Sequence, residues 1–542
     1  MATISLYSNI SALVIDDMAS QQTTLRGLLT ALGVTRVEVA SNADAALRQI
    51  ARKRFSLILC DYNLNAATDG QQLLEHLREN QLLPPDCQFF MITAEAAYAS
   101  VASATEHRPD GYLLKPVTAG NIGERLGSQL ERRHALRDVH QRMESQDWSD
   151  AIRECDKLLT AANRWSMAAL QLKGQALLQL GRHEDARAVF EKALAVRSGL
   201  TWAQIGLARA CKAAHQLDES IRITSAVLDE PDGAKNAEAF DLLAECHEEK
   251  GHVAEALKTL QRSAEVLPSA RRQRMVAECA YRHGDLVTAK ASYARVVKAT
   301  RGSIAANVQD GLALAQTLVD CGEMKEALAL LDEEARGNAT AVGAAALAVR
   351  GQALHKLGDV DGAKAAAGRA RSFLTKGRAD FATLAVAKLA LQQGETAAGL
   401  SLLQQAIRAD HENKRFGQLV GHTLSDTGHE AERERLFDDA IQGIKTQVNE
   451  AKSQFLSGHT AEALSLIESA LSDVPENTGV LLQAAQMSCM AMRMSKRSDN
   501  ATILRVQRYL GRLDKLMPGN DRVMRMRRYL SETLTMLEPK AA

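Results

Sequence analysis

Two patterns of hydrophobic positions divide the chain. Between residues 11 and 114, short apolar runs alternate with segments of helical periodicity. From about residue 136 onward, the apolar residues keep helical spacing alone. The first pattern predicts strands that alternate with helices, and therefore a parallel, doubly wound α/β sheet with right-handed crossovers. The second pattern predicts an all-α region.

The elements of the first region are closely defined by the pattern. Strands are expected at 11–15, 36–40, 55–60, 88–92 and 111–114, and helices at 20–32, 42–51, 70–79 and 98–107. A last helix begins near Asn121 and keeps helical spacing to Met143 without a proline or a flexible linker. The sequence leaves open whether this helix runs straight into the second region or breaks briefly.

Polar side chains follow the predicted strands at the points where the strands end. The first strand ends in Asp16-Asp17, the third in Asp61, the fourth in Thr93 and the fifth in Lys115. Because the carboxyl ends of parallel strands meet at one edge of the sheet, we expect these side chains to converge. Three crowded carboxylates repel one another unless a cation lies among them, and their oxygens suit Mg²⁺. The hydroxyl and the ammonium group would instead contact a phosphoryl group on Asp61.

In order and spacing, these four motifs resemble the receiver domain of two-component response regulators. The alanine after Thr93 and the proline after Lys115 add to the resemblance, which covers roughly residues 9–134. It implies a flavodoxin-like fold, a cis peptide before that proline, and Asp61 as the residue that becomes 4-aspartylphosphate. The loop 64–68 lacks the proline that many receivers carry after the acceptor and is one residue longer, so the shape of this loop is not implied.

The resemblance also implies a role for each remaining polar residue. Asp16 and Asp17 would hold Mg²⁺ together with Asp61 and the backbone carbonyl of Asn63, Lys115 would contact the phosphoryl group, Thr93 would be the switch hydroxyl, and Tyr112 the switch aromatic residue.

Two further positions bear on the lifetime of the phosphorylated form. Asn63 and Glu95 lie two residues beyond Asp61 and Thr93. In the receiver family, side chains at these places modulate how fast water reaches the acyl phosphate. An Asn/Glu pair resembles the chemotaxis-type regulator, which predicts a short-lived signal. The alternative is that both are merely exposed polar loop residues.

The helical region repeats a helix, a glycine turn and a small residue five positions later. The clearest unit has Gly181, Ala186 and Phe190. The same turn recurs at His215, Gly251, Gly284, Gly322, Gly358, Gly394, Gly428 and Gly458, and an upstream copy begins at Gln146. The spacing is close to the period of about 34 residues of tetratricopeptide repeats, and the stretch 136–475 resembles a solenoid of such repeats.

Packing explains the repeated pattern. Each unit is a helical hairpin that buries its apolar face against its neighbours. The glycine permits a left-handed turn, and the small residue lets the two helices approach closely. Arg433 makes the unit at Gly428 the poorest one. Cysteines 211, 246 and 279 fall on first helices of successive units, and we interpret them as small core residues rather than ligands.

These boundaries predict four parts: a tail at 1–8, the receiver at 9–134, the repeat solenoid at 135–479, and a basic, methionine-rich helical segment at 480–542. Residues 522–530 have the pattern of a basic amphipathic helix. We interpret this helix as a cap that closes the solenoid. The alternative is a helix that docks on an acidic partner or on the receiver.

Composition narrows the classes of function. Lys plus Arg and Asp plus Glu are equal at 66 each, so the net charge gives no reason to expect nucleic acid or an anionic membrane as partner. Eight cysteines are scattered without a paired framework, as is typical of a reducing compartment. There is no run of membrane-spanning length and no signal-peptide pattern, so we expect a cytoplasmic protein.

The functional hypothesis is a phosphorylation-controlled adaptor without an enzymatic output domain. A sensor histidine kinase or phosphotransfer protein would phosphorylate Asp61. Phosphorylation would then change the binding surface of the repeats or a contact within a homodimer. The target would be another signalling protein, such as a cyclic-di-GMP enzyme. The repeats would inhibit it until Asp61 is phosphorylated. The alternative is a phosphate sink that drains the kinase while the repeats only localise it.

Overall fold

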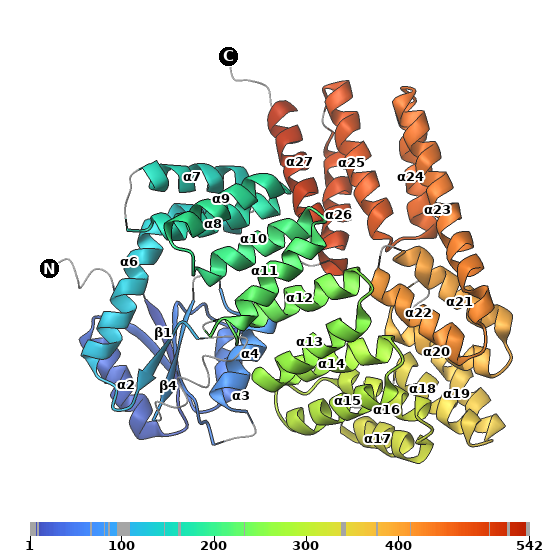
Figure 1. Cartoon of the computed structure of the whole chain (residues 1–542), viewed down its shortest axis with the longest axis horizontal. Coiled ribbons are helices and arrows are strands. Elements are labelled where there is room, and N and C mark those ends of the chain that lie inside the picture. Colours follow the sequence, from blue (N-terminus) through green and yellow to red (C-terminus); the bar gives the residue numbers. More distant parts are fainter. Residues whose placement is uncertain are drawn as a thin grey trace.

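The structure is a computed structural model of the whole chain. It describes residues 7, 10–65, 68–80, 82–84, 87–94, 109–145, 147–160, 164–231, 233–337, 343–374, 378–411, 413–497, 499–517 and 521–537. A parallel sheet with its helices lies at one side of a long curved array of helices (Figure 1).

The first region is a five-stranded parallel sheet, as the sequence predicts. Its strands are β1 (Ser11–Ile15), β2 (Arg36–Ala40), β3 (Leu57–Asp61), β4 (Gln88–Thr93) and β5 (Gly111–Leu114). They lie in the order β2-β1-β3-β4-β5, with all neighbouring pairs parallel. Every residue of the central strand β3 is buried, which explains its unbroken apolar run.

Helices cover both faces of this sheet. Alternate residues along the strands pack on α3 (Ala43–Ile50) and α4 (Gly70–Glu79) on one face. The others pack on α2 (Ala19–Ala31) and the first turns of α6 (Ala119–Glu144) on the opposite face. The region is therefore doubly wound. The helix predicted at 98–107 lies outside the described residues.

A single helix joins the sheet to the helical array. The first half of α6 buries Ile122 and Leu126 against the sheet, and its second half buries Leu136 and Val139. Val139 packs with residues of the first repeat. The helix therefore runs straight into the second region, and the predicted boundary between residues 134 and 135 falls inside it.

The second region consists of antiparallel helices. They are α7 (Trp148–Thr160), α8 (Ser166–Gln179), α9 (His183–Val196), α10 (Thr201–Ala213), α11 (Leu217–Asp229), α12 (Ala237–Glu249), α13 (Val253–Val266), α14 (Ala270–Arg282), α15 (Leu286–Thr300), α16 (Val308–Asp320), α17 (Met324–Gly337), α18 (Ala344–Lys356), α19 (Val360–Phe373), α20 (Phe381–Gln392), α21 (Thr396–Ala409), α22 (Lys414–Asp426), η3 (Glu430–Glu432), α23 (Arg433–Leu456), α24 (Thr460–Asp473), α25 (Thr478–Ser495), α26 (Asn500–Leu516) and α27 (Asp521–Leu537).

The repeated turns have the backbone that the sequence predicts. All nine marker residues have a positive φ, including the one that is not glycine, His215, at 61°. The small residue five positions later is buried in every unit except that of Gly428, where Arg433 is exposed. The left-handed turn and the close approach of two helices therefore recur together along the solenoid.

The unit after Gly428 departs from the hairpin pattern. A short 3₁₀ turn, η3, leads into α23, which continues for 24 residues to the turn at Gly458. Between 433 and 456 the chain has no proline and a single glycine, Gly443, so nothing in the sequence breaks the helix. One long helix therefore connects the turn at Gly428 to the turn at Gly458.

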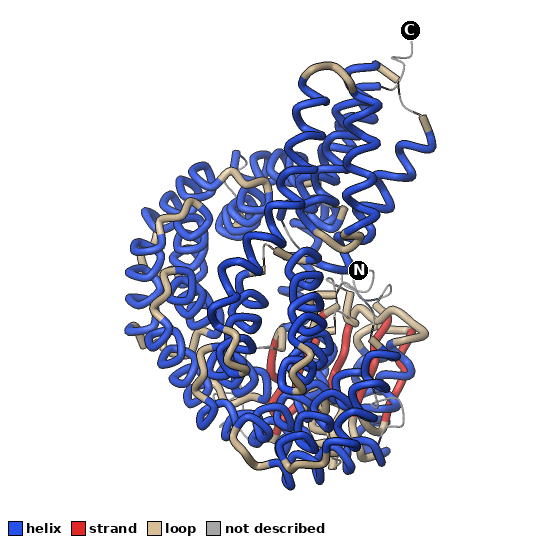
Figure 2. Tube along the Cα trace, turned by 90° about the vertical axis from the view of Figure 1, so that its right-hand side faces the viewer, coloured by secondary structure: helices blue, strands red, loops and turns tan. Residues whose placement is uncertain are grey.

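The solenoid curves strongly enough to bring distant units together, as Figure 2 shows. The ring of Tyr281 on α14 stacks on His422 of α22, with centroids 5.2 Å apart. Arg415, also on α22, forms an ion pair with Glu248 on α12. The inner surface of the curve is therefore lined by helices that are far apart in the sequence.

The basic C-terminal helix packs against helices from both ends of the solenoid, and its role as a cap remains a prediction. In α27, Val523, Met526 and Leu530 are buried in a cluster with α23 to α26. Met524 is buried in a second cluster, formed by the first repeats around Phe190. The helix thus contacts both the end of the solenoid and its beginning.

Candidate phospho-acceptor site

The polar residues at the strand ends converge on the carboxyl edge of the sheet, as expected. Asp61 is the last residue of β3, and Thr93 is the last residue of β4. Asp16 directly follows β1, which pairs with β3 so that Ile15 lies opposite Cys60. The Lys115 amide donates to the Thr93 carbonyl at 2.9 Å, which brings the lysine to the same edge.

The three carboxylates form one cluster. One oxygen from each of Asp16, Asp17 and Asp61 lies within 4.8 Å of the others. Asp16 is fully buried, and Asp61 is 7% exposed. Burial, together with the charges of the other two carboxylates, raises the pKa of Asp16, while a hydrogen bond from the Met18 amide and the Lys115 charge oppose the rise. The sequence predicted this crowding.

Lys115 is the cation that lies next to two of these carboxylates. Its Nζ is 2.9 Å from Asp61 Oδ2 and 3.7 Å from Asp16 Oδ2. The second distance is too long for a hydrogen bond, and Asp16 Oδ2 is buried without a hydrogen-bond partner among the described residues. Asp16 therefore presents an unused, buried oxygen to the centre of the cluster.

The cluster fits the predicted Mg²⁺ ion. A hard divalent cation prefers oxygen ligands, and an orphaned carboxylate oxygen beside two more carboxylates supplies them. Asn63, whose backbone carbonyl is the fourth predicted ligand, lies exposed two residues beyond Asp61. Its side-chain oxygen accepts a hydrogen bond from the Asn65 amide at 3.0 Å. Its contribution to the metal remains a prediction.

The switch residues lie where the sequence predicts them, and their roles remain predictions. Thr93 is 3% exposed. Tyr112 is half-buried on β5, opposite Met91, and packs on the core between the sheet and α3 and α4. The bond between Lys115 and Pro116 is cis, as the resemblance implied. Glu95, one of the two residues predicted to modulate dephosphorylation, lies outside the described residues.

Sequence reasoning missed a hydrogen bond between the acidic cluster and the loop after Asp61. Asn65 has a positive φ of 46°, and its side-chain amide donates to Asp17 Oδ2 at 2.6 Å. Asparagine tolerates the left-handed region better than most residues, and the unusual loop length was the signal that a residue here is special. Gln22 was missed as well: its amide donates to the Asp16 carbonyl at 2.6 Å.

The same loop is pressed onto the acceptor residue. A Cβ added to Gly70 would lie 2.3 Å from the Asp61 carbonyl oxygen, so this position requires glycine. Asp69 caps α4 by accepting from the Gln72 amide at 2.7 Å, in a capping box. The end of the loop is therefore fixed relative to Asp61.

A loop of the solenoid touches this segment. The amide of Ile304, between α15 and α16, donates to Thr68 Oγ1 at 3.3 Å. The Ile304 side chain packs against the hydrophobic core between the sheet and α3 and α4, and Thr68 is 5% exposed. Glu79, at the end of α4, lies within electrostatic range of Arg274 on α14. The receiver region is thus docked on the repeats beside its own acidic cluster.

Comparison with known proteins agrees with both regions. The family model for the response regulator receiver domain matches residues 12–127, and tetratricopeptide repeat models match 139–199 and 177–236. Chemotaxis protein CheY-3 of Vibrio cholerae is 29% identical over 127 residues, which are 23% of this chain and 96% of that protein. Transcriptional regulatory protein ZraR of Escherichia coli is 34% identical over 133 residues, 24% of this chain and 28% of that protein.

Solved structures with similar helices have low overall similarity. The C-terminal part of a repeat protein from Cytophaga hutchinsonii is 13% identical, covers 44% of this chain and 95% of its own, and has a TM-score of 0.36. A tetratricopeptide repeat protein from Parabacteroides merdae is 13% identical, covers 51% and 98%, and has a TM-score of 0.30. In the described part of this chain, no helix is long and apolar enough to cross a membrane. The family matches and the folded sheet together show that the chain contains a response regulator receiver domain followed by tetratricopeptide repeats.

Proposed function

We propose that phosphorylation of Asp61 controls which protein the repeat region binds. The observation that carries this proposal is the contact between Thr68 and Ile304. It joins the loop of the phospho-acceptor to the repeats across a wide gap in the sequence. A change at Asp61 therefore has a direct structural route to the solenoid.

The phosphoryl transfer uses the residues of the acidic cluster. A carboxylate oxygen of Asp61 attacks the phosphorus, and the bond from phosphorus to the nitrogen of a phosphohistidine donor breaks as the new P–O bond forms. Lys115, already 2.9 Å from Asp61, donates to the phosphoryl oxygens, and the Thr93 hydroxyl offers a second donor. Mg²⁺, held by Asp16, Asp17, Asp61 and the Asn63 carbonyl, would offset the added negative charge.

The signal then passes through two elements. Phosphorylation adds negative charge beside Asp17, whose carboxylate accepts from Asn65 in the loop that ends at Thr68. Because Gly70 lies against the Asp61 carbonyl, a shift of Asp61 would be transmitted to Thr68 and to its contact with Ile304. The continuous helix α6 offers a second route from the sheet to the first repeat. A difference of a few kcal/mol between two receiver states is sufficient to shift the population.

Two classes of partner follow from this proposal. A sensor histidine kinase or a phosphotransfer protein supplies the phosphoryl group to the receiver. A downstream signalling protein binds the repeats and is released or engaged when Asp61 is phosphorylated. This output is a protein contact, and no catalytic output is invoked.

Labelling and partner capture test the proposal. Radiolabelled acetyl phosphate with Mg²⁺ should label the native chain and leave Asp61→Asn unlabelled, while Asp44→Asn, a change at an exposed aspartate on α3, should label normally. Affinity capture from native cytoplasm should give different partner yields for Asp61→Ala and for the chain treated with an acyl-phosphate mimic. Equal yields would count against control by phosphorylation.

A further inference from the structure

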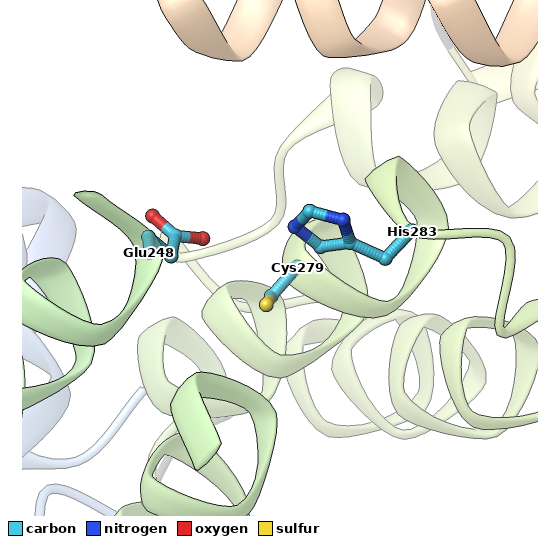
Figure 3. Close-up of side chains that lie close together, drawn as sticks. All are labelled: Glu248, Cys279 and His283. Carbon is cyan, nitrogen blue, oxygen red and sulfur yellow. The ribbon is translucent and has the colours of Figure 1, made fainter. Parts of the chain in front are cut away.

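A second group of potential ligands lies in the solenoid, away from the receiver. Glu248 is near the end of α12, Cys279 is on α14, and His283 directly follows α14 (Figure 3). Cys279 and His283 are four residues apart, which places them on one side of the helix, one turn from each other. One ligand atom from each of the three residues lies within 4.8 Å of the others. Helices from two successive repeats thus meet at this point.

The imidazole is the donor group without a partner among the described residues. Cys279 is fully buried, and its thiol forms a hydrogen bond with Glu248, another member of the group. His283 Nε2 is buried without a hydrogen-bond partner among the described residues, and Figure 3 shows the ring turned toward Glu248. A buried imidazole nitrogen without a partner costs free energy, and a metal ion would remove that cost.

Core packing alone explains why a cysteine lies at position 279. It does not explain why an imidazole and a carboxylate lie beside it. Cys246 occupies the corresponding place in the preceding repeat, five residues before the turn glycine Gly251. Its thiol donates to Ser220 Oγ at 3.3 Å, so a polar partner within the core satisfies it. Where the later repeat has His283, the preceding repeat has Lys250. The combination of thiol, imidazole and carboxylate is therefore particular to one repeat.

The surrounding charges select the kind of ion. Both oxygens of Glu248 are engaged by guanidinium groups, Oε1 by Arg282 and Oε2 by Arg415 at 3.1 Å. These cations orient the carboxylate and leave one lone pair on each oxygen. They also repel a bound cation, so an ion held by charge alone, such as Mg²⁺ or Ca²⁺, is disfavoured. An ion that forms strong bonds to sulfur and nitrogen is favoured instead.

We propose that Glu248, Cys279 and His283 bind one Zn²⁺ ion or a similar borderline transition-metal ion. The Cys279 thiol releases its proton to solvent when the Zn–S bond forms. Three protein ligands leave a fourth position for water or for a group of a bound partner. Arg282 and Arg415, which pair with Glu248, also line a cavity of about 450 Å³.

A cobalt titration of the full chain tests this site independently of phosphorylation. Excess Mg²⁺ first fills the acidic cluster of the receiver, and Co²⁺ is then added under reducing conditions. A thiolate ligand produces a sulfur-to-cobalt charge-transfer band, which carboxylate ligands alone cannot give. We expect this band to saturate at one equivalent of Co²⁺, with visible d–d bands of tetrahedral strength, and to be displaced by Zn²⁺.

Variants assign the band to the three residues. Cys279→Ala should abolish the band. His283→Gln, a change at a partly exposed residue, should weaken Co²⁺ binding so that the band no longer saturates at one equivalent of Co²⁺. Cys246→Ala, the matched change in the preceding repeat, should keep the band in full. Far-ultraviolet circular dichroism checks that each variant is folded. The absence of a band in the native chain, its persistence in Cys279→Ala, or its equal loss in Cys246→Ala would overturn the proposal.

Discussion

The receiver and the solenoid treat buried charge in opposite ways. In the described part of the solenoid, buried charged side chains such as Arg272, Asp310 and Lys388 each form an ion pair. In the receiver, Asp16 and Asp61 are buried beside Asp17 and share one cation, Lys115. This difference indicates where the functional site lies. In the repeats, buried charges are paired and stabilise the fold. In the receiver, the carboxylates outnumber the nearby cations, and this excess of negative charge can bind a metal ion next to a phosphoryl group.

The largest expected change in stability comes from breaking a solenoid pair. Lys388 Nζ lies 2.7 Å from Asp320 and 2.5 Å from Asp426, on a helix between the two. Lys388→Met leaves the buried Asp320 carboxylate without its cation, and we expect the free energy of unfolding to fall by about 3–5 kcal/mol. Chemical denaturation measures it.

An exposed pair provides the control for that change. Lys53 pairs with Glu38, and both side chains are largely exposed, at 59% and 43%. Lys53→Met should change the free energy of unfolding by less than about 1 kcal/mol, because solvent screens such pairs. A loss at Lys388 no larger than this control would mean that the interior pair is not needed.

In the receiver, removing a charge should have the opposite sign. Asp16→Asn relieves the repulsion among the carboxylates and removes a buried charge whose Oδ2 accepts no hydrogen bond, so in EDTA we expect the receiver to gain about 1–2 kcal/mol. The same variant should lose its Mg²⁺ response. Thermal unfolding with and without Mg²⁺ measures both. If Asp16→Asn is less stable than the native chain in EDTA, the claim that the Asp16 charge destabilises the metal-free receiver is wrong.

The pH dependence follows from the direction of the Asp16 shift. Because burial raises the pKa of Asp16 above its unfolded value, the folded carboxyl binds a proton first as the pH falls. Without Mg²⁺, its contribution to the free energy of unfolding therefore becomes more favourable as the pH falls through the raised pKa. The stability difference between Asp16→Asn and the native chain should shrink over that interval. A difference that grows on acidification would contradict this sign.

The contact between the two regions should have a smaller effect. Thr68→Val keeps the shape of the side chain but removes the acceptor of the Ile304 amide, which is worth about 1 kcal/mol. Hydrogen exchange at that amide should become about fivefold faster, the factor that corresponds to this energy. Thr23→Val, at an exposed threonine that bonds within its own helix, should leave it unchanged.

The smallest expected change concerns a repeat turn. His215 has a φ of 61°, a region that costs a non-glycine residue free energy, whereas Gly251 occupies the same turn at 77°. His215→Gly should raise the free energy of unfolding by about 0.5–1 kcal/mol, and Gly251→Ala should lower it by a similar amount. Denaturation midpoints of the two variants test whether backbone strain is equal along the solenoid.

Local sequence signals predicted much of this structure. The acidic cluster could be predicted because each of its residues ends a strand and parallel strands share an edge. The repeat turns could be predicted because each needs a left-handed residue at a fixed place. His215 was found by spacing alone, since histidine adopts that backbone less readily than glycine.

The remaining features depend on contacts that have no local signal. Nothing near Ile304 indicates that it meets Thr68, because the curvature of the solenoid, summed over several repeats, decides the contact. The long helix α23 is an exception: its sequence lacks a breaker, which is a local signal, but the spacing of the repeats predicted a hairpin there. The pairing of Glu248 with Arg415 likewise required the curve to be known.

Hydrogen exchange at the Ile304 amide tests the central claim most directly. The native chain is compared in Mg²⁺ with and without an acyl-phosphate mimic, and Asp61→Asn is treated in the same way. The account predicts that the mimic changes exchange at Ile304 in the native chain and leaves it unchanged in Asp61→Asn. Identical exchange at Ile304 in the native chain, under conditions where Asp61 is demonstrably modified, would contradict it.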